Sequence, residues 1–218
     1  MNKFERFLSK SEAFILAIDG EAASGKGTLS KKIAENYNFF YCPTSILYRK
    51  LAKKSLEKKI TKLDDLLSLA LTLNDFKEDG SLYEEEISRK ASELASIKEI
   101  REILNLHQRQ ILQNQKRILM EGRDIGTVIA PHADVKLYVS ANIEIRAERR
   151  FKDQILKNPN LTLEEVKNDL MERDNRDKNR ENAPMLIAED AIILDSSNCN
   201  AHEFYEEAIR SITSKISC

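Results

Sequence analysis

The sequence has few of the residues on which disulfide-stabilised domains and membrane proteins depend. It contains no tryptophan, and its three cysteines, Cys42, Cys199 and Cys218, are isolated in the chain, without the spacing of a metal site. An odd number of scattered cysteines fits a reducing cytoplasm better than a disulfide framework, so we expect a cytoplasmic protein. No apolar run approaches the length of a membrane span, and residues 1–10 lack the apolar centre of a secretion signal. We therefore expect no membrane partner.

An excess of charge of one sign is also missing. Charged residues make up 33% of the chain, but the net charge is only −1. This balance gives no indication of a cationic surface for nucleic acid, so we expect no nucleic-acid polymer as partner. The three histidines, His107, His132 and His202, are scattered, and we interpret them as surface or loop residues. The length of 218 residues suits one α/β domain with an insertion, or two small domains.

Glycine is scarce, and its distribution is informative. Of six glycines, three fall within residues 20–27, and two more are Gly122 and Gly126. Glycine permits close approach of the backbone to a ligand, so the two clusters indicate two places where backbone meets something closely. Ordinary turns could explain the second cluster taken alone.

The first glycine cluster has the context of a phosphate-binding loop. An apolar run at residues 14–18 is followed by Gly20, four further residues and then Gly25-Lys26-Gly27-Thr28, after which a helical pattern begins. This is the P-loop arrangement of strand, glycine loop and helix start. Backbone N–H groups and the positive end of the helix dipole would bind the phosphates, with Lys26 as a mobile charge. Thr28 offers a hydroxyl toward Mg²⁺. The alternative is a simple glycine turn with Lys26 on the surface.

The remaining chain alternates short apolar strands with amphipathic helices. We predict strands at residues 14–18, 39–41, 117–121, 135–139 and 191–194, and helices near 26–36, 44–56, 63–73, 87–113, 142–156, 162–173 and 201–216. Thr162 and Glu165 have the spacing of a capping box. Alternation of this kind predicts an α/β fold with a five-stranded parallel sheet covered on both faces, and sites at the carboxyl ends of the strands. Both glycine clusters directly follow a strand and should share that edge.

A change of composition divides the chain. Residues 57–90 are first leucine-rich and then acidic, and we interpret them as an inserted subdomain. The predicted organisation is therefore a core of residues 1–56 and 91–218, with the insert between them.

Arginines provide candidates for a second phosphate-binding site, because the guanidinium group binds phosphate oxygens in pairs. The candidates are Arg49 beside Tyr48, Arg101, Arg123 beside Asp124, and the group Arg173, Arg176 and Arg180. The alternative for this last group is a solvated helix face held by pairs such as Arg173 with Asp177. Arg123 could likewise form a structural ion pair.

These residues resemble a known family, the bacterial cytidylate kinases, which are P-loop nucleoside monophosphate kinases. The resemblance covers most of the chain. It is most specific in Gly122-Arg123-Asp124-Ile-Gly126-Thr127-Val, and in the run from Arg173 through Asp174, Arg176 and Asp177 to Arg180. It implies a P-loop three-layer fold, a monophosphate-binding insert at 57–90 and a short lid at about 157–184. The implied reaction is ATP + CMP giving ADP + CDP, with dCMP accepted, in pyrimidine metabolism.

The resemblance also implies a role for individual residues. The ATP phosphates would be bound by Gly20, Glu21, Ala22, Ala23, Ser24, Gly25, Lys26, Gly27 and Thr28, with Thr28 also toward Mg²⁺ and Arg149 and Arg176 on the lid side. CMP would be bound by Thr44, Tyr48, Arg49, Ser92, Arg101, Arg123, Asp124, Arg173, Asp177 and Arg180. Lys26, Arg123, Arg173 and Arg176 would be the catalytic cations. Ser92, Arg101 and Asp124 would read the cytosine.

The sequence departs from the family pattern at three places. Pro43-Thr44-Ser45 stands where an acid, a hydroxyl residue and glycine are usual, Ala23 replaces a loop glycine, and the insert is short. These departures bear on affinity and on the choice between CMP and UMP.

Two other functions remain open. A P-loop kinase could act on a different nucleotide or a small metabolite, or the chain could be a nucleotide-dependent switch without transfer. The sequence contains no Asn-Lys-x-Asp guanine motif, and the acceptor arginines would lack a purpose in a switch. We therefore predict a monomeric cytidylate kinase-type phosphotransferase that uses ATP with Mg²⁺.

Overall fold

The chain forms two compact units. A computed structural model describes residues 3–73, 75–76, 79–156 and 158–216. Unit 1 consists of Met1–Tyr41 and Lys116–Cys218, and unit 2 of Cys42–Gln115. The expected insert at residues 57–90 lies inside unit 2. Its role in binding CMP stays a prediction, as do the core boundaries at 1–56 and 91–218.

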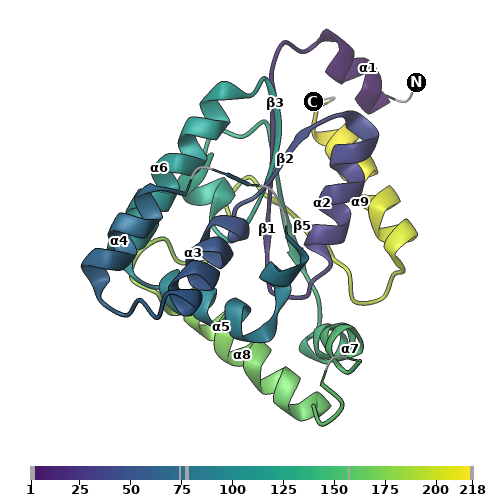
Figure 1. The fold of residues 1–218 in the computed structure, drawn as a ribbon. Coiled ribbons are helices and arrows are strands. Elements are labelled where there is room, and N and C mark those ends of the chain that lie inside the picture. Colours follow the sequence, from purple (N-terminus) through teal and green to yellow (C-terminus); the bar gives the residue numbers. More distant parts are fainter. Residues whose placement is uncertain (1–2, 74, 77–78, 157, 217–218) are drawn as a thin grey trace. The chain divides into compact units, whose positions relative to one another are not determined.

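Five strands form the sheet, and they are β1 Phe14–Gly20, β2 Phe40–Pro43, β3 Arg117–Glu121, β4 Val135–Ser140 and β5 Ile192–Asp195. Their order is β2-β3-β1-β4-β5 (Figure 1). The strand β1 pairs in parallel with β3 and β4, and β4 pairs in parallel with β5. The predicted α/β fold with a five-stranded parallel sheet is confirmed.

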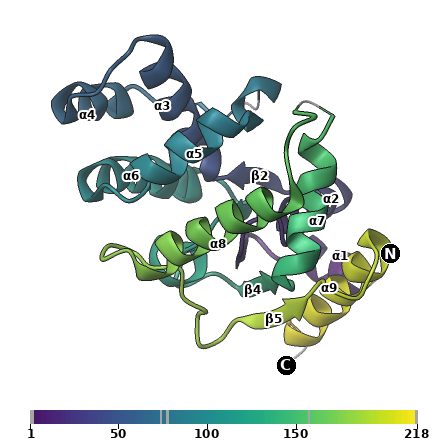
Figure 2. The same ribbon diagram turned by 90° about the horizontal axis from the view of Figure 1, so that it is seen from below.

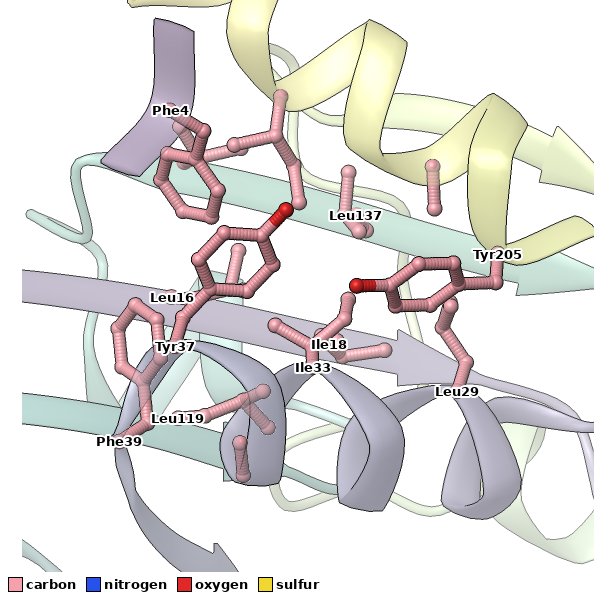
Figure 3. Close-up of a cluster of buried hydrophobic side chains, with 14 of the residues drawn as sticks. Phe4, Leu16, Ile18, Leu29, Ile33, Tyr37, Phe39, Leu119, Leu137 and Tyr205 are labelled. Atoms are coloured by element: carbon pink, nitrogen blue, oxygen red, sulfur yellow. The ribbon is translucent and has the colours of Figure 1, made fainter. Parts of the chain in front are cut away.

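Unit 1 buries one face of this sheet under helices. Its helices are α1 Lys3–Lys10, α2 Lys26–Tyr37, α7 Ile143–Gln154, α8 Leu163–Asn179 and α9 Ala201–Lys215, with a π-helical turn, η2, at Ile125–Ile129. Figure 3 shows Leu16 and Ile18 of β1 between α2 and α9, packed with Ile33 and Tyr205. Side chains alternate between the two faces of a strand, so Ala17 and Asp19 point to the opposite face.

Unit 2 is helical apart from the last residues of β2. It contains α3 Ser45–Glu57, α4 Leu63–Leu71, the 3₁₀ turn η1 Gly80–Tyr83, α5 Glu85–Leu94 and α6 Lys98–Asn114. Leu47, Leu51, Leu94, Ile100 and Leu104 are fully buried in its own hydrophobic core. Unit 2 therefore has a core separate from that of unit 1.

The single helix predicted over residues 87–113 is wrong, because the structure has two helices there, α5 and α6. The helix α5 ends at Leu94 with Ala95 as its C-cap, and the hydroxyl of Ser96 then donates a hydrogen bond to the carbonyl of Glu93 at 2.6 Å. Ile97 is extended, with ψ of 119°, and α6 starts after it. The apolar spacing continues across the break because residues of both helices pack into the same core.

The helix predicted over residues 162–173 is longer in the structure. The capping box at its start is confirmed, since Thr162 and Glu165 each bond the other's backbone N–H. The helix α8 continues to Asn179, so Arg173, Arg176 and Asp177 are helical. Arg180 is the C-cap residue with an extended backbone, so it does not share their helical face. Figure 2 shows α8 packed beside α7.

Strand register brings the two glycine stretches together in unit 1, as predicted. Ile18 of β1 lies opposite Glu121 of β3, and the N–H of Gly122 donates to the Ile18 carbonyl at 3.0 Å. The loop after β1 and the segment after β3 therefore leave the same edge of the sheet.

Two further expectations concern the membrane and the cysteines. None of the described helices combines the length and apolar character that crossing a membrane requires. Cys42 and Cys199 are free thiols, and Cys218 lies outside the described residues.

Candidate active site

The loop from Gly20 to Gly25 connects β1 to α2 and is held in a special backbone conformation. Gly20 has a φ of 146°, and a Cβ atom there would lie 2.0 Å from the carbonyl oxygen of Val139 on β4. Gly25, the N-cap of α2, has a φ of 84°. Any side chain at Gly20 would clash with Val139, and a side chain at either Gly20 or Gly25 would strain the backbone because both have a positive φ. Ala23 also has a left-handed φ, 57°, without being glycine.

Lys26 begins α2 and is buried, with 7% of its surface exposed. Its ammonium group donates to the carbonyl of Glu21 at 3.1 Å and lies 3.7 Å from Oε1 of Glu121. Burial, aided by the positive charge of Arg123, lowers the pKa of Lys26 to about 7, although Glu121 opposes this. Lys26 thus lies beside the loop with a lowered pKa, and a negatively charged ligand would raise that pKa and favour the protonated form.

Glu121 is a site residue that the sequence reasoning missed. It ends β3, its carboxylate accepts a 2.5 Å hydrogen bond from the Tyr41 hydroxyl, and it lies close to where a Gly27 side chain would be, 3.6 Å away. An acid at the end of a strand, directly before Gly122-Arg123-Asp124, was the available signal. Gly27 directly precedes the predicted Mg²⁺ ligand Thr28 in α2.

Arg123, which follows β3, and Arg180, the C-cap residue of α8, both contact acidic side chains in unit 1. Arg123 Nε donates to Asp177 Oδ2 at 2.9 Å. Arg180 reaches Asp124 at 3.4 Å and Asp177 at 3.7 Å, and its Nε donates to the Ala183 carbonyl. Burial by itself would lower the pKa of Arg123, but Asp177 raises it overall. Burial likewise opposes ionisation of Asp177, yet Arg123 and Arg173 lower its pKa. The four predicted residues Arg123, Asp124, Asp177 and Arg180 are therefore brought together.

Arg173 lies one helical turn before Asp177 and is less well compensated. Its Nε is buried and makes no hydrogen bond within the described part of the chain. Burial and the charge of Arg123 lower the pKa of Arg173 to about 10. The arrangement leaves Arg173 with unmet capacity to bind an anion.

Side chains of α7 and α8 contact the phosphate loop. Asp174 accepts the Ala22 N–H at 3.3 Å, and Arg146 donates to the Ala22 carbonyl at 3.1 Å while also pairing with Asp174. Lys178 forms a 2.9 Å ion pair with Glu21. Sequence reasoning assigned no role to Arg146 or to Asp174. Arg146, Asp174 and Lys178 together hold residues Glu21 and Ala22 of the loop in place.

The predicted lid-side residues differ in how closely they meet the loop. Arg149 Nη1 donates to the hydroxyl of Ser196 at 2.9 Å, and that hydroxyl donates to the Ser24 carbonyl at 2.8 Å. A Cβ atom on Gly25 would lie 3.8 Å from Arg149 Nη1. Arg149 therefore lies at the loop, while Arg176 is a partly exposed residue of α8.

Unit 2 contains the other predicted acceptor residues. Arg49 Nη1 donates to the Leu82 carbonyl and to the Ser88 hydroxyl, both at 2.7 Å, and its guanidinium group lies 4.8 Å from the ring of Tyr83. Arg101 lies 5.7 Å from the ring of Tyr48. Arg49, Arg101, Ser92 and Thr44 are all buried. Within this unit, Tyr48 and Arg101 are brought together as a cation–aromatic pair.

Asp19 is a further residue that the sequence reasoning did not place in the site. Its buried carboxylate accepts hydrogen bonds from the N–H groups of Ile125 and Gly126, at 2.9 and 2.7 Å. Burial raises the pKa of Asp19 to about 7, against the effect of these two bonds.

Comparison with known proteins decides the family. The profile described as cytidylate kinase matches residues 16–214. The chain belongs to the cytidylate kinase family. It is 40% identical over 213 residues to a cytidylate kinase of Rickettsia bellii, covering 97% of this chain and 98% of that one. It is 42% identical over 208 residues to a cytidylate kinase of Rickettsia felis, covering 94% of both chains.

Solved structures support the fold of this cytidylate kinase family member. An uncharacterised protein from Eubacterium ventriosum has a TM-score of 0.54 at 16% identity, covering 92% of this chain and 98% of that one. A shikimate kinase from Acinetobacter baumannii has a TM-score of 0.50 at 12% identity, covering 96% and 97%. At these identities the likeness concerns the fold alone.

Proposed function

We propose that the protein transfers the γ-phosphoryl group of ATP to CMP, and also to dCMP, giving ADP and CDP or dCDP. Family membership supports the reaction. The observation that carries the assignment of the site is a lysine-bearing phosphate loop in the same unit as the partly buried arginines Arg123, Arg173 and Arg180. A donor triphosphate and an acceptor phosphate are both anionic, and their reaction requires cations on both sides.

On the donor side, the backbone N–H groups of residues 20–28 would bind the ATP phosphates at the start of α2. Lys26 would release the Glu21 carbonyl and bond the β- and γ-phosphates. Arg149 of α7 and Arg176 would contact ATP on the lid side, and we place the lid itself at about residues 157–184.

The residues next to the loop fit a magnesium ion. Thr28 offers a hydroxyl, and Glu121 offers a carboxylate whose side chain is only 13% exposed. The described residues contain no group of three or more His, Cys, Asp or Glu side chains suited to a metal. Mg²⁺ commonly takes one or two protein ligands and completes its shell with water and phosphate. When bound, it would neutralise charge on the β- and γ-phosphates.

On the acceptor side, Arg123 and Arg173 would bind the CMP phosphate or the transferring group. Asp177 and Arg180 would reach the ribose, and Asp124 the cytosine amino group. In unit 2, Thr44, Tyr48 and Arg49 would contribute to acceptor binding, while Ser92 and Arg101 would read the base. The insert at residues 57–90 would form part of this subdomain.

The mechanism is positioning and electrostatic stabilisation. The attacking oxygen of CMP is already anionic, so no general base is required. Lys26, Arg123, Arg173 and Arg176 would neutralise charge on two phosphates held in line. Asp177 holds the Arg123 guanidinium group before substrate arrives, which reduces the reorganisation needed during the reaction.

Acceptor selectivity is the test that separates this function from the alternatives. Purified protein is assayed for ADP release with ATP and CMP, dCMP, UMP, AMP, dTMP or shikimate. We expect CMP and dCMP to be the best acceptors, and Arg101→Met to reduce this preference. Lys98→Met, on the exposed surface of α6, is the matched control. Preference for another acceptor would indicate a different P-loop kinase, and ATP binding without acceptor-stimulated ADP release would indicate a switch.

Oligomeric state and location belong to the same proposal. We propose a monomer that acts in the cytoplasm on small nucleotides, with no nucleic-acid polymer or membrane as partner. Light scattering of the purified protein, with and without nucleotides, tests the monomer.

A further inference from the structure

Asp19 occupies an unusual place in the sheet. It lies between Ile18, whose side chain is in the core beneath α2 and α9, and Gly20, the first residue of the phosphate loop. Strand alternation directs its carboxylate to the other face, where the turn η2 contacts β1. A charged side chain with 5% exposure at this point requires compensation.

The compensation comes from two consecutive backbone N–H groups. Each carboxylate oxygen accepts one hydrogen bond: Oδ1 from the N–H of Ile125 at 2.9 Å and Oδ2 from the N–H of Gly126 at 2.7 Å. These N–H groups are at the start of a helical turn, where they have no partner within the turn itself. Asp19 thus fixes the residues that directly follow Arg123 and Asp124.

The side chain of Lys136 on β4 also lies against Gly126. A Cβ atom on Gly126 would lie 3.1 Å from Lys136 Cδ and 3.4 Å from Asp19 Oδ2. The lysine ammonium group donates to the Pro131 carbonyl at 2.6 Å and to Asp190 at 2.8 Å. The Asp19 carboxylate and the aliphatic part of Lys136 therefore both pack against Gly126.

We propose that Asp19 is a positioning residue for the acceptor nucleotide: it fixes the segment of Arg123 and Asp124 relative to the phosphate loop by bonding the N–H groups of Ile125 and Gly126. This inference rests on the acceptor-side roles proposed above for Arg123 and Asp124. According to this inference, β1 not only leads into the ATP-binding loop but also positions residues that bind CMP.

Asp19→Asn is the first test, because it keeps the side-chain shape but directs an NH₂ group at one of the N–H donors. We expect KM for CMP to rise about tenfold or more and KM for ATP to change by less than about threefold. Amide hydrogen exchange at Ile125 and Gly126 should accelerate. The matched control is Asp134→Asn, which removes a carboxylate acceptor from Ile15 N–H, at the other end of β1, and should leave both KM values unchanged.

Gly126→Ala is the second test and keeps Asp19 intact. The φ of Gly126 lies outside the left-handed region, so the added methyl acts by crowding Asp19 and Lys136. We expect the same selective rise in KM for CMP. This variant also decides the matter if Asp19→Asn fails to fold in urea titrations.

Arg123→Ala separates failure of this inference from failure of the proposed roles. If Arg123→Ala leaves KM for CMP and turnover unchanged, the acceptor-side assignment is rejected. The positioning role of Asp19 is overturned by a different result, in which Arg123→Ala is impaired in activity but Asp19→Asn and Gly126→Ala change KM for ATP and KM for CMP equally. It is also overturned if these two variants leave amide exchange at Ile125 and Gly126 unchanged.

Discussion

The ammonium group of Lys26 lies 3.7 Å from a carboxylate oxygen of Glu121, at the point where β1 and β3 end side by side. This single acid does not outweigh burial and the nearby arginines, so the lysine pKa falls to about 7. The charged form of Lys26 is therefore disfavoured in the protein without ligand, and a bound phosphate would stabilise it.

The first prediction concerns stability of the protein without nucleotide. Since the folded state binds the Lys26 proton less tightly than the unfolded state, the lysine destabilises the fold fully below pH 7, and this effect fades as the pH rises toward 10.5. We expect Lys26→Met to be more stable than the wild type at pH 7. The difference should narrow by about 2 kcal/mol between pH 7 and pH 9. Urea unfolding at both values measures it, with Lys98→Met as the exposed control; a constant difference would contradict the shift.

The second prediction concerns proton uptake on ATP binding. At pH 8 a lysine with a pKa near 7 is largely neutral, and the phosphates should raise that pKa and recharge it. We expect uptake of about one proton per ATP at pH 8, declining toward zero below pH 6. Isothermal titration calorimetry in two buffers with different ionisation enthalpies gives this number. Lys26→Met should bind ATP more weakly and without uptake, whereas uptake that persists in this variant would implicate another group.

The third prediction concerns Arg173. Its buried Nε makes no hydrogen bond among the described residues and its pKa is lowered to about 10, so the free protein gains little stability from this cation. We expect Arg173→Met to unfold at the same urea concentration or higher, while turnover falls by a factor on the order of 10³. Arg173→Lys should recover little, since an ammonium group lacks the planar fork. A variant that loses stability and keeps most turnover would show a structural role.

The fourth prediction concerns Ala23, which has a φ of 57° in the phosphate loop. A left-handed conformation costs a non-glycine residue roughly 1–2 kcal/mol, and glycine loses roughly 0.5–1 kcal/mol through its flexibility in the unfolded chain. We expect Ala23→Gly to stabilise the protein by roughly 0.5 kcal/mol, measured by urea unfolding. Ala22→Gly is the control, because Ala22 has no positive φ and is buried, and it should be destabilising. If Ala23→Gly destabilises the protein, the packing free energy of the Ala23 methyl group is larger than the strain energy of its left-handed backbone.

Sequence reasoning succeeded where the signal is local. The strand, glycine loop and lysine at residues 14–28 are consecutive in the chain. Thr162 and Glu165, which mark a helix start, are three residues apart. It failed at residues 95–97, where the apolar spacing continues although the helix does not, because two helices contribute to one core. It also missed Glu121 and Asp19, whose partners Tyr41, Ile125 and Gly126 are distant in the chain.

The sequence by itself determined the fold class, the phosphate loop and the family, since these depend on residue type and on spacings of a few positions. Only the tertiary structure decided which ions are paired and which are not. Arg123, Arg173 and Arg180 look alike in the sequence, yet Asp177 and Asp124 compensate the first and last while Arg173 is left short of a partner for its Nε. Pairing of this kind depends on burial and on strand register, which bring together side chains more than fifty residues apart.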